Sequence, residues 1–400
     1  MATMQRSVLS LSLLLLALTA LVAPHAANAS EPAVTSAATA VEPIEDDPFT
    51  LEDKKALCDK DFDGYNQALR LLTVTPEVRQ PTPKGKDGQY PRILCYVITV
   101  AKYLSARAQA VADTWGQRCD HLIFFSDVPD TVYVAKGTSR ERKFEVIKVD
   151  ANADYEHLWE RQKAILTYVH QHYRHDFDWF YKADDDTYLF VENLRQYVRR
   201  PEIMMNYHRH PLQLGHRYNI TASYINYFFP NEKVRDAWWQ RWDRLVFNSG
   251  GPGYAMNRLY LDHFVASIPE KHCLSHSGTF PEDVAVALCM MWHEGYPWDT
   301  RDLRGRDRWH AFNPRDAYTS SPDRASDWWI AYHQGIGGLR WGDDCCAPDT
   351  VGFHYAKPDG MYHIERQLYF CRSGDDVPNL STYNRKYNLA LSSNVSASPP

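Results

Sequence analysis

Three consecutive aspartates, Asp184, Asp185 and Asp186, are the residues whose type and spacing point most directly to chemistry. An aromatic run at residues 177–181 precedes them, and an apolar stretch at 188–191 follows them. Adjacent carboxylates repel one another, and hard divalent cations bind carboxylate oxygens. The pattern therefore predicts a buried strand that ends in a cation-binding turn. A solvated acidic loop is the alternative, but the flanking aromatic residues place the triplet at the edge of a core.

Strand-like and helix-like segments alternate around this triplet. Continuous apolar runs, typical of parallel strands covered on both faces, occur at residues 93–100, 121–125 and 144–149. Helical periodicity occurs at residues 104–115, 155–173 and 191–200. This alternation predicts an α/β fold with a doubly wound sheet, in which ligands bind at the carboxyl ends of the strands.

The second half of the sequence is less regular. Residues 248–254 are rich in glycine, which lets backbone approach a ligand, although a tight structural turn is an equally good interpretation. Helices are expected at 259–267 and 282–294, the second with Thr279 and Glu282 spaced as a capping box. No Gly-x-Gly-x-x-Gly follows the first strand and no Gly-Lys-Ser/Thr phosphate loop occurs, so bound phosphates would need a metal.

The N-terminal residues 1–29 have the features of a secretory leader. A basic residue precedes the apolar segment 8–23, and a small-x-small site follows it. The apolar segment is shorter than the roughly 20 residues of a spanning helix, so a signal peptide and an uncleaved signal anchor both stay open. Residues 30–90 are expected to form a stem and linker with a helix near 57–72, and residues 373–400 a disordered tail.

Composition narrows the class of protein. The net charge of -6 over 400 residues argues against nucleic acid as a partner. Eight cysteines in a chain with a secretory leader favour disulfides, whose connectivity the sequence does not determine. The 12 Trp and 25 Tyr are typical of sugar-handling proteins, and an aromatic-rich core explains them equally well.

Six short segments occur in the order found in a known family. They are residues 92–97, 114–119, 179–188, 249–254, 282–284 and the pair Cys345-Cys346 with 352–355. The sequence resembles the inverting β-1,3-glycosyltransferases, which include fringe and the core 1 galactosyltransferases of mucin-type O-glycosylation. The resemblance implies a GT-A fold with a Rossmann-like, doubly wound mixed sheet in one catalytic domain at 91–372. It also implies a UDP-sugar donor, Mn²⁺ and a type II Golgi membrane protein with a lumenal catalytic domain, rather than a secreted one.

The resemblance also implies roles for single residues. Asp186 and His354 would hold the metal with Asp184, and Asp184 and Asp185 would face the ribose and sugar of the donor. Asp283 would be the base of a single in-line displacement. The plain alternative for His354 is a packed structural histidine. The plain alternative for Asp283 is a carboxylate that only favours the N-terminus of its helix. Further candidates for donor binding are Gly250, Gly251, Tyr254 and the cations Arg107 and Lys163.

The positions of the cysteines, which resemble those in the family, also suggest how the disulfides form. Cys95 is expected to pair with Cys119. Two more bridges are expected among Cys273, Cys289, Cys345 and Cys346 with the connectivity open, while Cys58 and Cys371 either pair or stay free.

The implied reaction is transfer of galactose from UDP-galactose to the 3-hydroxyl of O-linked GalNAc on glycoproteins. A fringe-like GlcNAc transferase, a non-catalytic chaperone-like relative and a metal-dependent hydrolase are the alternatives. The chaperone-like relative would be expected to lose the acidic triplet, and a two-metal hydrolase needs more ligands than are visible. An aromatic insert at about 220–246 departs from the family pattern and leaves the acceptor open. A homodimer is a further partner expectation.

Overall fold

The computed structural model describes residues 51–74, 91–134, 142–152, 154–220, 232–274 and 281–372. The expected leader, the stem up to residue 50 and the C-terminal tail lie outside these ranges. Within the described ranges, no helix combines the length and the apolar character that crossing a membrane requires.

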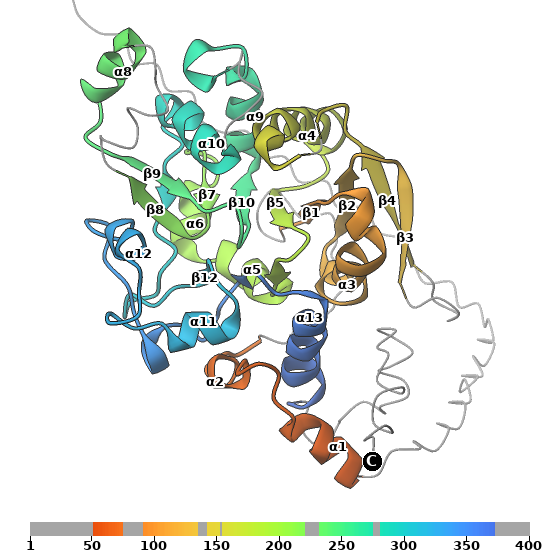
Figure 1. The fold of residues 1–400 in the computed structure, drawn as a ribbon. Helices are drawn as coiled ribbons and strands as arrows, with labels where there is room; N and C mark the ends of the chain where they lie inside the picture. Colours follow the sequence, from red (N-terminus) through yellow and green to blue (C-terminus); the bar gives the residue numbers. More distant parts are fainter. Residues whose placement is uncertain are drawn as a thin grey trace, which may run out of the picture. The chain divides into compact units, whose positions relative to one another are not determined.

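An eight-stranded mixed sheet lies at the centre of the folded unit, in the order β11-β7-β10-β5-β1-β2-β4-β3 (Figure 1). Its strands are β1 (Ile93–Ile98), β2 (His121–Ser126), β3 (Asp130–Val134), β4 (Arg142–Lys148), β5 (Trp179–Asp184), β7 (Gln213–Leu214), β10 (Tyr254–Asn257) and β11 (Pro297–Trp298). β1, β2, β4 and β5 run parallel, whereas β10 runs antiparallel to β5 and to β7. The antiparallel β3 was not predicted. The sheet confirms the predicted α/β class and the single GT-A domain.

β1 shows why the apolar runs fold as central strands. All six of its residues are buried, and alternate side chains enter two different cores. Ile93, Cys95 and Val97 belong to one cluster, and Leu94, Tyr96 and Ile98 belong to the other. Burial of each large apolar side chain stabilises the fold by about 1.5–3 kcal/mol, so a strand covered on both faces must be apolar throughout.

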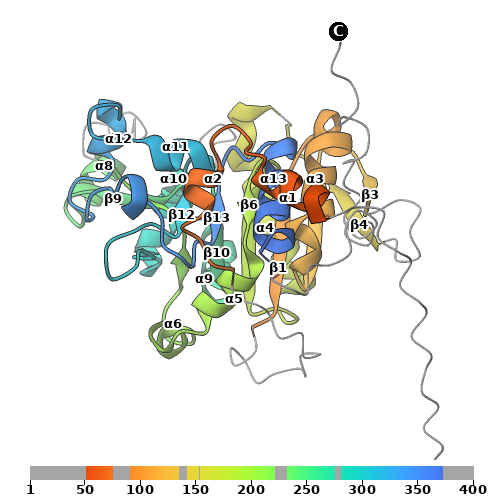
Figure 2. The same ribbon diagram turned by 90° about the horizontal axis from the view of Figure 1, so that it is seen from below.

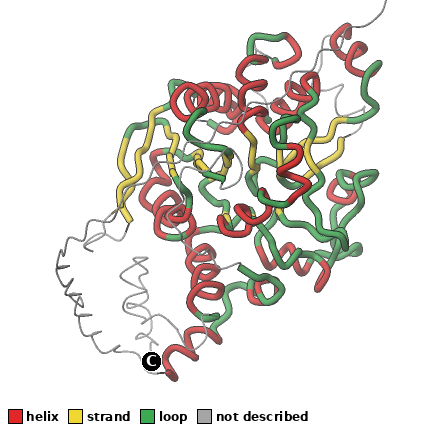
Figure 3. Tube along the Cα trace, turned by 180° about the vertical axis from the view of Figure 1, so that it is seen from behind, coloured by secondary structure: helices red, strands yellow, loops and turns green. Residues whose placement is uncertain are grey.

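Helices cover both faces of the sheet. On one side lie α4 (Leu158–Tyr173), α9 (Arg258–Ser267) and α10 (Glu282–Met290), and on the other α3 (Gln109–Asp113), α5 (Val191–Val198) and α13 (Pro358–Glu365) (Figure 1). Figure 3 shows the same arrangement from behind, with the strands between the helices. The remaining helices are α1 (Leu51–Asp59), α2 (Asn66–Leu69), α6 (Pro201–Asn206), α8 (Glu232–Trp239), α11 (Pro314–Thr319) and α12 (Asp327–Ala331).

Two small sheets flank the central one. The three-stranded sheet contains β6 (Tyr188–Leu189), β12 (Trp309–His310) and β13 (Gly352–Phe353), and the two-stranded sheet contains β8 (Arg217–Ile220) and β9 (Leu245–Asn248). In the aromatic insert after β8, Trp238 of α8 is buried and its ring contacts that of Trp242. Tyr224, Tyr227, Phe228 and Phe229 of the insert lie outside the described residues.

Residues 51–74, assigned to the stem and linker from the sequence, are part of the folded unit. Their helical pattern forms α1 and α2, which lie beside α13 (Figure 2). Tyr65, Leu69 and Leu72 are buried in the same core as Ile93, Cys95 and Val97 of β1. The packed segment therefore begins before residue 91, where the sequence analysis set the domain boundary.

All eight cysteines form disulfides. The expected Cys95–Cys119 pair is confirmed, and the open connectivity resolves into the pairs Cys273–Cys289, Cys345–Cys346 and Cys58–Cys371. The last pair ties the N-terminal segment to the end of the described chain.

Candidate active site

The acidic triplet lies where β5 ends, between β1 and β10. The backbone N–H of Thr187 donates to the carbonyl of Asp184 over 3.1 Å and closes the turn. The Thr187 hydroxyl accepts from the N–H of Asp184 over 3.1 Å and donates to the carbonyl of Gly251 over 2.7 Å. The turn that carries the triplet is thus fixed to the glycine-rich loop.

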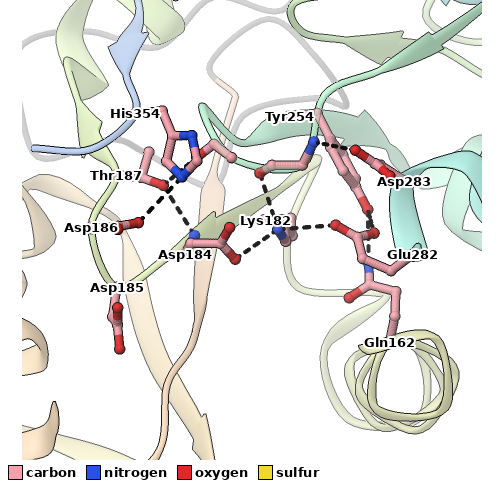
Figure 4. A network of polar contacts seen from close by, with 12 residues as sticks. Gln162, Lys182, Asp184, Asp185, Asp186, Thr187, Tyr254, Glu282, Asp283 and His354 are labelled. Atoms are coloured by element: carbon pink, nitrogen blue, oxygen red, sulfur yellow. Dashed lines mark hydrogen bonds and ion pairs between the residues drawn. The ribbon is translucent and has the colours of Figure 1, made fainter. Parts of the chain in front are cut away.

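Pairing of β6 with β13 brings His354 to the triplet. Tyr188 lies opposite Phe353, and the N–H of Ala356 donates to the carbonyl of Asp186 over 2.8 Å. The Nε2 of His354 is 3.4 Å from the Oδ1 of Asp186. One ligand atom each from Asp184, Asp186 and His354 lie within 4.8 Å of one another (Figure 4). Two carboxylates and one imidazole suit a divalent cation such as Mn²⁺.

Arg107 compensates part of this negative charge. Its Nη1 lies 3.0 Å from Asp185 Oδ1 and 3.4 Å from Asp186 Oδ2. Burial raises the pKa of Asp185 to about 6, although hydrogen bonds from Thr99 and Arg107 oppose the shift. Burial would also raise the pKa of Asp186, but the hydrogen bond and charge of His354 hold it below its ordinary value. Because its pKa is lowered while that of Asp185 is raised, Asp186 stays ionised more readily than Asp185.

A buried lysine, missed in the sequence analysis, joins the triplet to α10. The Nζ of Lys182 is 2.8 Å from Asp184 Oδ1, 3.0 Å from Glu282 Oε1 and 3.0 Å from the carbonyl of Gly250. Burial raises the pKa of Glu282 to about 7, against the charge of Lys182. Burial lowers the pKa of Lys182, but the two carboxylates outweigh it and keep the ammonium charged. A lysine inside a buried aromatic strand is a signal that the sequence did offer.

Tyr254, a candidate for donor binding, supports this network from β10. It is fully buried on β10, and its hydroxyl donates to Glu282 Oε2 over 3.0 Å while it accepts from Gln162 over 2.9 Å (Figure 4). Since both roles of the hydroxyl are taken, the structure places Tyr254 in the core rather than against a ligand.

Lys163 lies on α4, with its ammonium 5.3 Å from the centre of the Trp159 ring. Burial lowers its pKa, and the charge of Glu160 opposes this. Arg107 contacts the acidic triplet directly, through Asp185 and Asp186, while a donor-binding role for Lys163 stays a prediction.

Asp283 lies in the first turn of α10 and faces the glycine-rich loop. Its Oδ2 accepts from the N–H of Gly250 over 3.0 Å, and its Oδ1 accepts from the N–H of Val284 over 2.9 Å. The side chain is half-buried. Burial raises the pKa of Asp283 more than the two hydrogen bonds lower it. The carboxylate is therefore a stronger base than an ordinary aspartate, despite its place at a helix N-terminus.

The capping-box interpretation of Glu282 is wrong. The helix begins at Glu282 itself, with Pro281 at the N-cap, so Glu282 occupies the first helical position rather than the third. Its carboxylate binds Lys182 and Tyr254 instead of the helix backbone. Thr279 lies outside the described residues.

The glycine-rich loop connects the metal ligands to Asp283. A Cβ atom at Gly250 would collide with the Glu282 carboxylate, and one at Gly251 would collide with the His354 imidazole. Gly253 has a φ of +78°, which favours glycine. The loop is thus a tight turn packed against both groups, as the structural interpretation predicts. Its approach to a ligand stays a prediction.

Two exposed tyrosines, which the sequence analysis did not single out, stand beside the site. Tyr355 is 47% exposed and stacks on the His354 ring, with 3.7 Å between ring centres. Tyr155 is 86% exposed. Partial burial of its hydroxyl and then the charges of Asp283 and Asp184 raise the pKa of Tyr155. Aromatic rings in such places can stack on the apolar face of a sugar.

The fold and this set of residues are those of a glycosyltransferase, and the chain belongs to the Fringe-like family, whose sequence model matches residues 89–297. The chain is 26% identical over 309 residues to glycoprotein-N-acetylgalactosamine 3-beta-galactosyltransferase 1 of Xenopus laevis, an overlap of 77% of this chain and 72% of that protein. These findings confirm the resemblance to the β-1,3-glycosyltransferases.

Two further relatives have other names. The chain is 29% identical to chondroitin sulfate synthase 3 of Homo sapiens, over 50% of this chain and 20% of that protein. It is 25% identical to beta-1,3-N-acetylglucosaminyltransferase manic fringe of Pan troglodytes, over 48% of this chain and 55% of that protein. The galactosyltransferase and the N-acetylglucosaminyltransferase among these relatives differ by name in the sugar that they transfer.

Proposed function

We propose that this chain is a metal-dependent inverting β-1,3-galactosyltransferase that moves galactose from UDP-galactose to the 3-hydroxyl of O-linked GalNAc on glycoproteins. The observation that carries the proposal is the position of a basic carboxylate, Asp283, one glycine-rich turn away from the Asp184, Asp186 and His354 group. The extent of the match to the Xenopus laevis galactosyltransferase favours galactose over the fringe-like sugar.

Asp186 and His354, with Asp184 beside them, would hold Mn²⁺, and this donor set fits a cation that binds both oxygen and imidazole nitrogen. The bound cation would stabilise the charge that develops on the diphosphate leaving group. Arg107 already spans Asp185 and Asp186 and is partly exposed, so its guanidinium can also face a diphosphate.

Asp283 would take the proton of the acceptor hydroxyl. As that hydroxyl oxygen bonds to C1 of galactose, the bond from C1 to the UDP oxygen breaks and the configuration at C1 inverts. The N–H groups of Gly250 and Val284 orient the carboxylate, and its raised pKa improves it as a base. The exposed rings of Tyr155 and Tyr355 would stack on the sugars.

The test is UDP release from UDP-galactose with and without a peptide that carries O-linked GalNAc. We expect release that needs both Mn²⁺ and the glycopeptide, with a β-1,3 linkage in the product. UDP-GlcNAc in place of UDP-galactose tests the fringe-like alternative, and release without any acceptor would indicate a hydrolase. No transfer with any donor, in a chain that folds, would favour the chaperone-like relative.

We also propose that the protein resides in the Golgi lumen and is anchored by residues 1–29. Microscopy of the tagged full-length chain against a Golgi marker tests this. Release of the protein into the medium would instead support a cleaved leader and secretion.

A further inference from the structure

A second group of metal-binding side chains lies outside the candidate active site. Glu270, His272 and His293 each offer one ligand atom, and these atoms lie within 4.8 Å of one another. The Nε2 of His272 is 3.1 Å from Glu270 Oε2, and the Nε2 of His293 is 3.6 Å from the same oxygen. Ligand atoms in a tetrahedral zinc site with bonds near 2.0–2.2 Å are about 3.4 Å apart. The two distances to Glu270 are therefore close to those of a zinc site, and the third lies within 4.8 Å.

Two imidazole nitrogens face Glu270, the Nε2 atoms of His272 and His293. Both Nε2 atoms are buried, and neither makes a hydrogen bond of acceptable geometry to any residue that the structure describes. An unsatisfied buried polar atom is costly, and a cation between the three side chains would remove that cost.

The framework of this group is fixed by covalent chemistry. His272 precedes Cys273 in a short turn at Lys271–Cys273, and His293 ends the turn Met291–His293 that continues α10. The Cys273–Cys289 disulfide joins these two segments. Aromatic side chains pack around them, with the Trp292 ring centre 5.1 Å from that of His272. The disulfide thus holds the turn that carries His272 against α10, which lowers the conformational cost of binding a metal.

We propose that Glu270, His272 and His293 form a second metal site that binds Zn²⁺, with a water molecule as the fourth ligand. Two imidazoles and one carboxylate select zinc, whereas the Asp184, Asp186 and His354 group is richer in carboxylate oxygen and suits Mn²⁺. The site lies at the end of α10 opposite to Glu282 and Asp283, away from the candidate active site. It holds that helix in place, and it is independent of the proposed transfer chemistry.

The test is titration of the metal-stripped full-length chain with Zn²⁺, followed by calorimetry and by elemental analysis of bound zinc. His354→Ala removes zinc binding at the candidate active site and leaves one bound Zn²⁺ per chain as the expected result. In that background, the double variant His272→Ala and His293→Ala loses two direct ligands of the remaining site. We expect its zinc affinity to fall by more than the about 10–100-fold that the loss of an outer-shell partner costs. His210→Ala, at an exposed histidine elsewhere, is the matched control and keeps full zinc affinity.

Glu270→Gln keeps the test decisive if the double histidine variant does not fold, since Glu270 is exposed and its loss removes little packing. Zn²⁺ is expected to raise the melting temperature of the His354→Ala protein by a few degrees, and not that of the same protein with Glu270→Gln. Co²⁺ as a probe should give the intense visible absorption of a tetrahedral site, lost with Glu270→Gln. Zinc affinity unchanged by Glu270→Gln, or no bound zinc in the His354→Ala protein, would show that the group is only an ion pair.

Discussion

The two sides of β5 are built differently and carry different parts of the proposed reaction. On one side β1, β2 and β4 run parallel to β5, and the segment that follows β1 supplies Arg107. On the other side β10 runs antiparallel, and the glycine-rich loop before it contacts Asp283. In the proposed reaction, the charge on the donor and the proton of the acceptor would be handled by separate sets of residues that meet at β5.

The largest expected effect is loss of donor binding on the parallel side. Asp186→Ala should reduce Mn²⁺-dependent UDP binding below detection, because a diphosphate and three carboxylates repel one another without a cation between them. His354→Ala should act in the same way, and chelation should abolish binding by the parent. Calorimetry with UDP checks this, with exposed Asp243→Ala as the control. Binding as tight as in the parent would mean that the metal ligands lie elsewhere.

The second largest expected effect is a loss of transfer without a loss of donor binding, which distinguishes the β10 side of β5 from the parallel side. Asp283→Asn keeps the shape of the side chain and removes its basicity, so transfer should fall by roughly 10²–10⁴-fold, as is typical for loss of a general base. UDP binding in Mn²⁺ should stay within a few fold of the parent. If transfer survives at near the parent rate, Asp283 is not the base, and Glu282→Gln is the variant to compare next.

A third variant breaks the connection between the sides. Lys182→Met leaves the buried carboxylate of Glu282 without its partner, which should cost about 3–5 kcal/mol of unfolding free energy. Adding Glu282→Gln should recover part of that loss, because the uncompensated charge is gone. Urea denaturation of the parent, the single and the double variant measures the coupling. Additive losses would show that the pair is not coupled.

The smallest expected effect is a difference in pH dependence. The pKa of Asp283 is raised, so its protonated form appears at a higher pH than for an ordinary aspartate, and transfer should decrease as the pH falls through that raised pKa. Turnover at saturating donor should show this acid limb, and the residual turnover of Asp283→Asn should lack it. An identical acid limb in both proteins would assign it to another group.

The parallel side could be predicted from the sequence because long apolar runs and helical periodicity leave few alternatives there. Strand β3 was missed since it is an edge strand that begins at Asp130 and lies outside the apolar runs. On the other side, strands of two to four residues, such as β7 and β10, are too short to show a period. The acidic triplet, His354 and Asp283 were predicted as site residues from motifs in the sequence. The pairing of β6 with β13, which the sequence did not predict, explains why His354 lies next to Asp186.

Other site residues needed the three-dimensional structure. Tyr155 belongs to no recognisable motif. Its hydroxyl senses the charge of Asp283 because α4, which follows Tyr155, packs against α10. His272 and His293 are separated in sequence, and a disulfide whose pairing was left open brings them together. Lys182 is different, since a charged residue within a buried strand could have been recognised in advance as a member of the site.

The most direct test of the central claim is a crystal structure with UDP and Mn²⁺ in which the anomalous signal of manganese locates the ion. The account predicts a peak within bonding distance of Asp186 and His354, with the diphosphate of UDP in contact with the same ion. A manganese peak only at Glu270, His272 and His293, or UDP bound away from the end of β5, would contradict it.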